Sequence, residues 1–456
     1  RSSLSAHRRM RGRLIGVVKP RLKPSNPRGI ALVVIGLAFA IAGCGSDSNN
    51  QSVAPPPPKP VLRGSCAPSS SLGVLVHGKD VTSYVPKGNW GSSTTGVSVV
   101  QVEPTAAAAP AAVPTVIATA SAVNSCGSDA KNGQTVCVAN NTDVYLIKGD
   151  SLTQTLHSSG TTTVHFSGGT CTNCGVAIDS VNNKALITLG TAGGPGFQYL
   201  DLNKTPKFES AFASASQKVS EDPLVDPIRK LILSPNENGK YELIKNSSTK
   251  PAFFENPSDS DAEYDSAGED CATGIALATD EFTSNLFLAN LTQATFTPGT
   301  PGSWTAPSQL QNVPDFGPLS FGTNGMAVAQ NTHTGVVVGE FGGNTFGAIL
   351  LPSSAGTGVP ALSDWVVCSI PSDPSSAPWE GGNDPHTVTA YQSPNSNDAI
   401  ALMANGDGNP PTFLAVVDLT KMLDTTIVPR TAGTHTCTSG TNLQTLGVLT
   451  FVAVPQ

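Results

Sequence analysis

Long helical patterns, catalytic signatures and phosphate-binding loops are missing from this sequence of 456 residues. Its apolar residues recur in short alternating runs between turn residues, with 45 Gly and 36 Pro in all, and this pattern excludes a mainly helical protein. The patterns GxSxG, HExxH, GxGxxG and GxxxxGK[ST] do not occur. Motifs therefore assign no reaction, and no catalytic residue is identified.

Acidic residues are absent from residues 1–43, which contain nine Lys or Arg. An apolar run at 30–41 is followed by the small residues Ala42 and Gly43. This order is that of a secretory signal peptide. The alternative is a transmembrane anchor, but twelve residues span only about 18 Å as a helix, whereas a bilayer core is about 30 Å thick.

The residues Ile41-Ala42-Gly43-Cys44 resemble the lipobox of bacterial lipoproteins, where a signal peptidase cuts before a cysteine that carries lipid. The resemblance implies export to the bacterial cell envelope and a membrane anchor through lipid on Cys44. Gly45 stands where an inner-membrane retention signal often has Asp, which favours the outer membrane. We predict a signal peptide at 1–43 and a Pro-rich, extended tether at 44–62.

Basic residues are scarce in the exported part. Residues 44–456 keep 17 Lys and Arg against 33 Asp and Glu, a net charge of −16. No Lys or Arg occurs between Lys250 and Lys421, yet this stretch holds eighteen acidic residues. Such a surface repels nucleic acid, which is excluded as a partner. It attracts metal cations or basic partners, or it is simply a solvated acidic surface.

Eight cysteines remain after Cys44, and an even number in an exported chain favours disulfides. Cys126 and Cys137 make the best pair because turn-forming residues separate them. Cys171 and Cys174 form a CxxC motif, for which a tight structural disulfide is the first interpretation. Redox activity and metal binding are the alternatives, although a four-cysteine zinc site would need scattered ligands.

Short strand-like segments recur along the chain with openings near residues 175, 223, 274, 325 and 385, spaced by 48 to 60 residues. A further unit lies around 123–148. A period near fifty with several short strands per unit is typical of propeller blades. We predict an all-β protein with a single β-propeller of six or seven blades, seven being favoured. A pair of β-sandwich domains is the alternative.

These repeats resemble the YVTN, NHL and gluconolactonase-like propellers of exported bacterial proteins. We assign propeller repeats to 115–456 and a segment of N-terminal strands with a Pro/Ala-rich loop to 63–114. A propeller ring has to close, because each blade buries its faces only against its neighbours. We therefore expect the apolar run at 446–453 to pair with strands near 72–76.

In a propeller the innermost strands begin near one mouth of the central channel, so side chains at the repeat openings converge there. The candidates for one axial site are Glu221, Asp222, Asn324, Asp384 and His386. Their carboxylate, amide and imidazole groups suit Ca²⁺ or another divalent cation, and a metal-bound water serves hydrolysis. Alternatively, the two Asp residues make turns before Pro and the His hydrogen-bonds locally.

Functions of different classes fit these observations. The first hypothesis is a binding or scaffold module of the cell envelope, with an envelope protein or a small molecule as its ligand. The second is a metal-dependent hydrolase, such as a lactonase, at the channel mouth. A structural surface protein without a specific ligand is the third.

Overall fold

The computed structural model describes residues 72–454, except for 78–79, 88–94, 103–114, 140–142, 157–173, 190–195, 215–221, 237–239, 256–262, 265, 281–285, 297–309, 314–322, 340–344, 359, 370–386 and 405–412. The chain divides into two compact units, 1–59 and 60–456, and every described residue belongs to the second. The predicted signal peptide, Cys44 and the tether lie outside this range. Within it, no helix combines the length and apolar character needed to span a membrane.

The described chain forms seven four-stranded antiparallel sheets, which are numbered here as blades in chain order. The strands of blades 1 to 3 are β1 (Gly73–His77), β2 (Asp80–Pro86), β3 (Val97–Val102), β4 (Thr115–Ile117), β5 (Val123–Asp129), β6 (Gln134–Ala139), β7 (Val144–Lys148), β8 (Ser151–Leu156), β9 (Val176–Asp179), β10 (Lys184–Thr188), β11 (Phe197–Asp201) and β12 (Lys207–Phe208). Each blade pairs its strands in chain order, as a meander.

The strands of blades 4 to 7 are β13 (Leu224–Asp226), β14 (Leu231–Ser234), β15 (Lys240–Lys245), β16 (Ala252–Glu255), β17 (Gly268–Asp270), β18 (Ile275–Thr279), β19 (Leu286–Asn290), β20 (Leu310–Val313), β21 (Thr323–Ala329), β22 (Thr334–Gly339), β23 (Thr345–Leu350), β24 (Asp364–Ser369), β25 (Thr387–Gln392), β26 (Ala399–Ala404), β27 (Phe413–Asp418) and β28 (Leu449–Ala453). The two described helices are short, namely the 3-10 helix η1 (Leu291–Gln293) and α1 (Leu419–Leu423).

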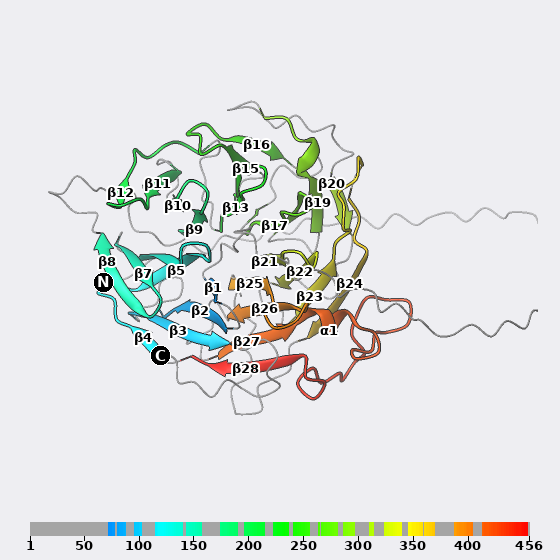
Figure 1. Ribbon diagram of the computed structural model, residues 1–456. Coiled ribbons are helices and arrows are strands. Elements are labelled where there is room, and N and C mark those ends of the chain that lie inside the picture. The colour runs from blue at the N-terminus through cyan, green and yellow to red at the C-terminus, as the bar shows by residue number, and fades with distance from the viewer. Residues whose placement is uncertain are drawn as a thin grey trace, which may run out of the picture. The chain divides into compact units, whose positions relative to one another are not determined.

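The seven sheets form the ring of a β-propeller (Figure 1). The first strand of each blade lies toward the centre, and first strands of successive blades are in contact. Hydrophobic clusters fill the spaces between neighbouring sheets, as the cluster shared by β6, β7, β9 and β10 illustrates. The all-β prediction of one propeller with seven blades is confirmed, and the pair of β-sandwiches is excluded.

The ring closes by packing of sheets and not by exchange of a strand. Strand β28 pairs with β27, and β1 pairs with β2, so each terminal blade draws all four strands from its own segment. Blades 1 and 7 share one cluster of buried side chains that includes Val74, Val81, Leu402 and Val416. The prediction that 446–453 pairs with strands near 72–76 is therefore wrong, because blade 7 needs no strand from elsewhere.

Two further findings adjust the repeat boundaries. Strands β1 to β4 form blade 1, so the propeller includes strands from the segment 63–114 that the sequence had set apart. The apolar run after Gly274 is β18, the second strand of blade 5 and not the first. The first strand is β17, which reads Gly-Glu-Asp and has no apolar residue to mark it.

A recurring turn joins the first two strands of blades 2 to 5, and an Asp at the end of the first strand holds it. Backbone N–H groups two residues ahead donate to these carboxylates at 2.8–3.1 Å in all four turns. The anchoring residues are Asp129, Asp179, Asp226 and Asp270. An Asp side chain that caps its own turn fixes the hairpin register locally.

Candidate functional site

The structure describes part of the predicted axial site. Asp222 lies two residues before β13, and Asn324 is the second residue of β21, so both occur at the beginning of an innermost strand. Glu221, Asp384 and His386 lie outside the described residues. That the five side chains converge on one site therefore stays a prediction.

Asp222 takes part in the junction between blades 4 and 5. It forms a parallel bridge with Ser266, the Ser266 hydroxyl donates to its carboxylate at 3.4 Å, and its carbonyl accepts the Ala267 N–H at 3.0 Å. The residue is only 2% exposed. These contacts give Asp222 a role in joining two blades.

A group of polar side chains, most of them ionisable, links blades 4, 5 and 6. We call it the polar joint, and it consists of Asp226, Arg229, Glu269, Asp270, Gln330 and His333. Its members come from the ends of the first strands β13, β17 and β21 and from the turns that follow them. All of them therefore gather at the same side of three consecutive blades.

Arg229 is the cation of the polar joint. Its Nη1 donates to Asp226 Oδ2 at 2.9 Å and to the Cys271 carbonyl at 2.8 Å, and it lies 3.8 Å from Glu269 Oε1. Gly274, with φ of +80°, leaves room for the guanidinium, since a Cβ there would lie 2.4 Å from Arg229 Cζ. The arginine of blade 4 thus pairs with the Asp226 carboxylate of its own blade and contacts the Cys271 carbonyl and the Glu269 carboxyl group of blade 5.

The setting of Glu269 favours its protonated form. Its complete burial raises the pKa well above the usual value, and the charge of Asp226 and a side-chain hydrogen bond with Asp226 raise it further, against the opposing effect of Arg229. A neutral Glu269 carboxyl beside an Asp226 carboxylate avoids two like charges in one buried place.

Asp226, Glu269 and Cys271 also place potential metal ligands within 4.8 Å of one another. Cys271 is disulfide-bonded and has no thiolate to offer a metal. Arg229 already occupies the position of a cation between the two carboxyl groups. The donor set therefore does not fit a metal ion.

Blades 5 and 6 meet through two further contacts. His333 Nδ1 lies 2.6 Å from Asp270 Oδ2, and this hydrogen bond raises the pKa of His333, although partial burial works against the shift. The Gln330 side chain accepts the Cys271 N–H at 2.8 Å and donates to the Glu269 carbonyl at 2.6 Å. An amide side chain thus completes the backbone hydrogen bonds of the neighbouring blade.

The polar joint contains the residue types of a catalytic acid–base pair, but its carboxyl groups are not accessible to a substrate. Asp226, Glu269 and Asp270 are at most 1% exposed, so a substrate has no path to their carboxyl groups. Sequence reasoning missed Arg229, Glu269 and His333. The available signal was the Asp that ends the first strand in four successive blades, since it marks equivalent turns from which neighbouring blades face one another.

Disulfides, which the even cysteine count predicted, are present. Cys126 and Cys137 face each other across β5 and β6 and are bonded, with their Cα atoms 4.1 Å apart. Cys174 is disulfide-bonded too, whereas Cys171 lies outside the described residues. A second described bond, Cys368–Cys437, joins cysteines 69 positions apart and was not foreseen.

That second disulfide fixes residues 419–448, which we call the strap, to the neighbouring blade. The strap connects β27 to β28 within blade 7, yet it lies along β24, the outer strand of blade 6. Val367 N donates to the His435 carbonyl and Cys437 N donates to the Val367 carbonyl, both at 2.8 Å. The strap thus lies against part of this edge strand (Figure 1), and it pairs the backbone N–H and carbonyl of Val367.

Side chains reinforce the strap. Arg430 Nη1 donates to Asp364 Oδ1 at 2.8 Å. Partial burial raises the pKa of Asp364, but the contact with Arg430 outweighs this effect, and the pKa of Asp364 is lowered. The ring of His435 stacks on Trp365 with centroids 4.0 Å apart. Blade 7 is therefore joined to blade 6 by a covalent bond, an ion pair and a ring contact.

Comparison with known proteins gives no family. No family model and no curated protein matches the sequence. Among solved structures, a chain of "COPII on membranes, outer coat vertex" matches with a TM-score of 0.48 and 12% identity, covering 75% of this chain and 82% of that chain. A chain of "The structure of the COPII coat assembled on membranes" matches with the same TM-score of 0.48 and the same identity of 12%. That match covers 75% of this chain but only 46% of the COPII chain. Nothing about function follows from these similarities.

Proposed function

We propose that this chain is an exported lipoprotein of the bacterial cell envelope whose propeller serves as a binding or scaffold module. The observation that carries the proposal is the use of the buried ionisable groups of the polar joint. Asp226, Arg229, Asp270 and His333 make contacts within or between blades, and the carboxyl groups of Asp226 and Asp270 are buried away from any substrate. A ring whose polar groups maintain its shape suits a protein that presents surfaces.

The charge distribution supports a partner other than nucleic acid. Residues 44–255, which end with blade 4, contain 15 basic and 15 acidic residues, whereas residues 256–456 contain 2 basic and 18 acidic ones. The entire net charge of −16 is therefore carried by the part of the chain that holds blades 5 to 7. An envelope protein with a basic surface or a small ligand fits such a module, while phosphate backbones are repelled.

A metal-dependent hydrolase at the channel mouth is our second proposal. It is supported by Asp222 and Asn324, which occur at the beginning of the innermost strands of blades 4 and 6. The metal content of the purified chain and of its His386→Ala variant tests it. A bound divalent cation that the variant loses would support the hydrolase proposal. A metal-free chain would contradict it and leave only the proposal of a binding module.

The lipid anchor is tested by replacing Cys44 with Ala in the full-length precursor. Because lipid attachment needs the cysteine thiol, we expect the variant to leave the membrane fraction, while the original chain stays there through its acyl chains. The matched control is Cys66→Ala, which removes a cysteine but leaves the Ile41–Cys44 sequence unchanged. Equal membrane retention of the Cys44 variant and the original chain would refute lipid anchoring.

A further inference from the structure

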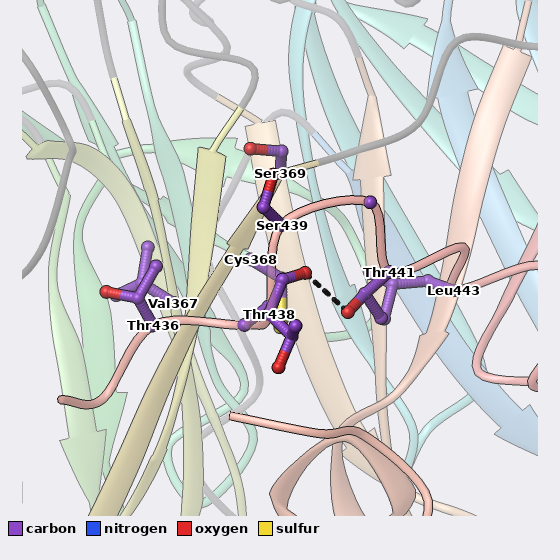
Figure 2. A pocket seen from close by; sticks show the side chains of 10 residues that line it. Val367, Cys368, Ser369, Thr436, Thr438, Ser439, Thr441 and Leu443 are labelled. Carbon is purple, nitrogen blue, oxygen red and sulfur yellow. Dashed lines mark hydrogen bonds between the residues drawn. A yellow bond between two sulfur atoms is a disulfide. The ribbon is translucent and has the colours of Figure 1, made fainter. Parts of the chain in front are cut away.

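The strap and blade 6 border a pocket of about 160 Å³ that is open to solvent and that none of the preceding functions uses. One wall is the end of β24, and the other is the strap segment that follows His435 (Figure 2). The Cys368–Cys437 disulfide and the buried Leu443 are part of the lining. The complete lining is Val367, Cys368, Ser369, Thr436, Cys437, Thr438, Ser439, Gly440, Thr441 and Leu443.

Hydroxyl groups dominate this lining, and none of its residues carries a charge. The Thr441 hydroxyl donates to the Thr438 carbonyl at 2.6 Å, a contact drawn in Figure 2. The other hydroxyls, those of Ser369, Thr436, Thr438 and Ser439, make no hydrogen bond to any described part of the chain. Each of these groups can both donate and accept a hydrogen bond.

The cavity wall is held in place before any ligand arrives. Cys437 is fixed by its disulfide and by the hydrogen bond from its N–H to Val367, and Thr438 N donates to the Pro429 carbonyl at 2.9 Å. Thr441 N donates to the Thr438 carbonyl at 3.0 Å. A preformed wall lowers the entropic cost of binding, because little has to become ordered.

Size and chemistry together define the ligand. A cavity of about 150 Å³ accommodates one six-membered ring. An anion would lack a counter-charge here, because no lining residue is basic and Arg430 of the strap is already engaged by Asp364. An apolar ring would displace water from the hydroxyls without replacing its hydrogen bonds. A neutral ring that carries hydroxyl groups satisfies both conditions.

We propose that this cavity binds one neutral sugar ring, either as a free monosaccharide or as the end of a glycan. The ring hydroxyls exchange hydrogen bonds with the four hydroxyl side chains, and the Cys368–Cys437 disulfide holds the two walls together beneath the sugar. The pocket includes neither the lipid anchor nor the channel mouth. The proposal of a sugar site can therefore be refuted without affecting the proposals for those two sites.

Saturation-transfer NMR on the purified chain with intact disulfides tests the proposal. The probes are D-glucose, D-galactose, D-mannose and N-acetyl-D-glucosamine, together with their methyl glycosides. A ligand of about twelve heavy atoms with ordinary binding efficiency has a Kd on the order of 1 mM, so we expect at least one probe to bind at this level. Binding of the methyl glycoside as well identifies a glycan end, and binding of the free sugar alone identifies a monosaccharide. No transfer to any probe at about ten times this concentration overturns the proposal.

Variants locate the site. Thr438→Val combined with Ser439→Ala should weaken binding at least tenfold, and Ser369→Leu, which fills the cavity from the β24 wall, should abolish it. The matched control is Thr431→Val, which removes an exposed strap hydroxyl outside the cavity and should leave the Kd unchanged. Thermal melting confirms that each variant is folded. Unchanged sugar binding in the folded double variant, or displacement of the sugar by inorganic phosphate, would overturn the proposal.

Discussion

The joint between blades 7 and 1 is packed mainly by aliphatic side chains and Tyr391, whereas the joint that links blades 4, 5 and 6 contains buried ionisable groups. Both lie in one ring and both connect blades of the same design. The first is formed by cluster members such as Val81 and Leu402, which make contacts without direction. The second depends on hydrogen bonds with fixed partners and short distances.

The difference shows two ways of joining repeated sheets. Hydrophobic burial is proportional to the area removed from water and tolerates small shifts between sheets. A shift between the blades would separate Arg229 from the Cys271 carbonyl or His333 from Asp270, and the second separation would leave the buried Asp270 without its partner. Aliphatic packing therefore closes the ring, while the polar joint sets how blades 4 to 6 align.

Breaking the polar joint has the largest expected effect. Arg229→Leu leaves the fully buried Asp226 carboxylate without its cation, and we expect a loss of about 3–5 kcal/mol in the free energy of unfolding. The matched variant Asp226→Asn with Arg229→Leu removes both charges and should recover much of this loss, because the Asn side chain still accepts the turn N–H groups. Urea unfolding measures both. A double variant no more stable than the single one would contradict the role of the charge pair.

Opening the aliphatic joint has a somewhat smaller expected effect. Leu402→Ala, at a side chain with no exposure, should lower the free energy of unfolding by about 3 kcal/mol. Because this cluster joins the first and last blades in the described part of the chain, backbone amides of β1 and β25 should exchange faster with solvent. The control Leu288→Ala removes a buried leucine between blades 5 and 6 and should leave those amides protected. Faster exchange at β1 and β25 in both variants would remove the distinction between the joints.

The sequence predicts most of the fold because strand patterns are local. The predicted openings near residues 175, 223 and 325 coincide with the innermost strands β9, β13 and β21. The prediction failed at blade 5, where the first strand is Gly268-Glu269-Asp270 and its burial comes from neighbouring blades and not from its own apolar residues. It failed again at ring closure, since face-to-face packing leaves no pairing pattern in a sequence.

The sites were less predictable than the fold for the same physical reason. Arg229 and Glu269 come from different blades, and only the closed ring brings them to 3.8 Å. The Cys368–Cys437 bond depends on the course of the strap across another blade, which local residues do not encode. By contrast, the Cys126–Cys137 pair lies within one hairpin, and the turn-forming residues between the two cysteines were enough to identify it.

The smallest effect separates the joints by their response to pH. An unfolded chain releases the Glu269 proton near pH 4.5, whereas the folded chain retains it, because burial and Asp226 raise the pKa of this carboxyl. Folding therefore takes up a proton, and the contribution of Glu269 to stability is complete below about pH 4.5 and is lost as the pH rises toward the folded pKa. His333 acts in the same direction, with its contribution complete below about pH 6.5, since Asp270 raises its pKa.

Glu269→Gln isolates the first of these contributions, because the amide replaces a protonated carboxyl and does not ionise. The stability of the original chain minus that of the variant should decrease from pH 5 to pH 8 in thermal or urea unfolding. Asp424→Asn is the control. The pKa of the exposed Asp424 is lowered by hydrogen bonding to Thr426, so its contribution changes below pH 3.8 and the difference stays flat from pH 5 to pH 8. A flat difference for Glu269→Gln as well would show that Glu269 is ionised in the folded ring, and the polar joint would then contain two buried carboxylates shared by Arg229.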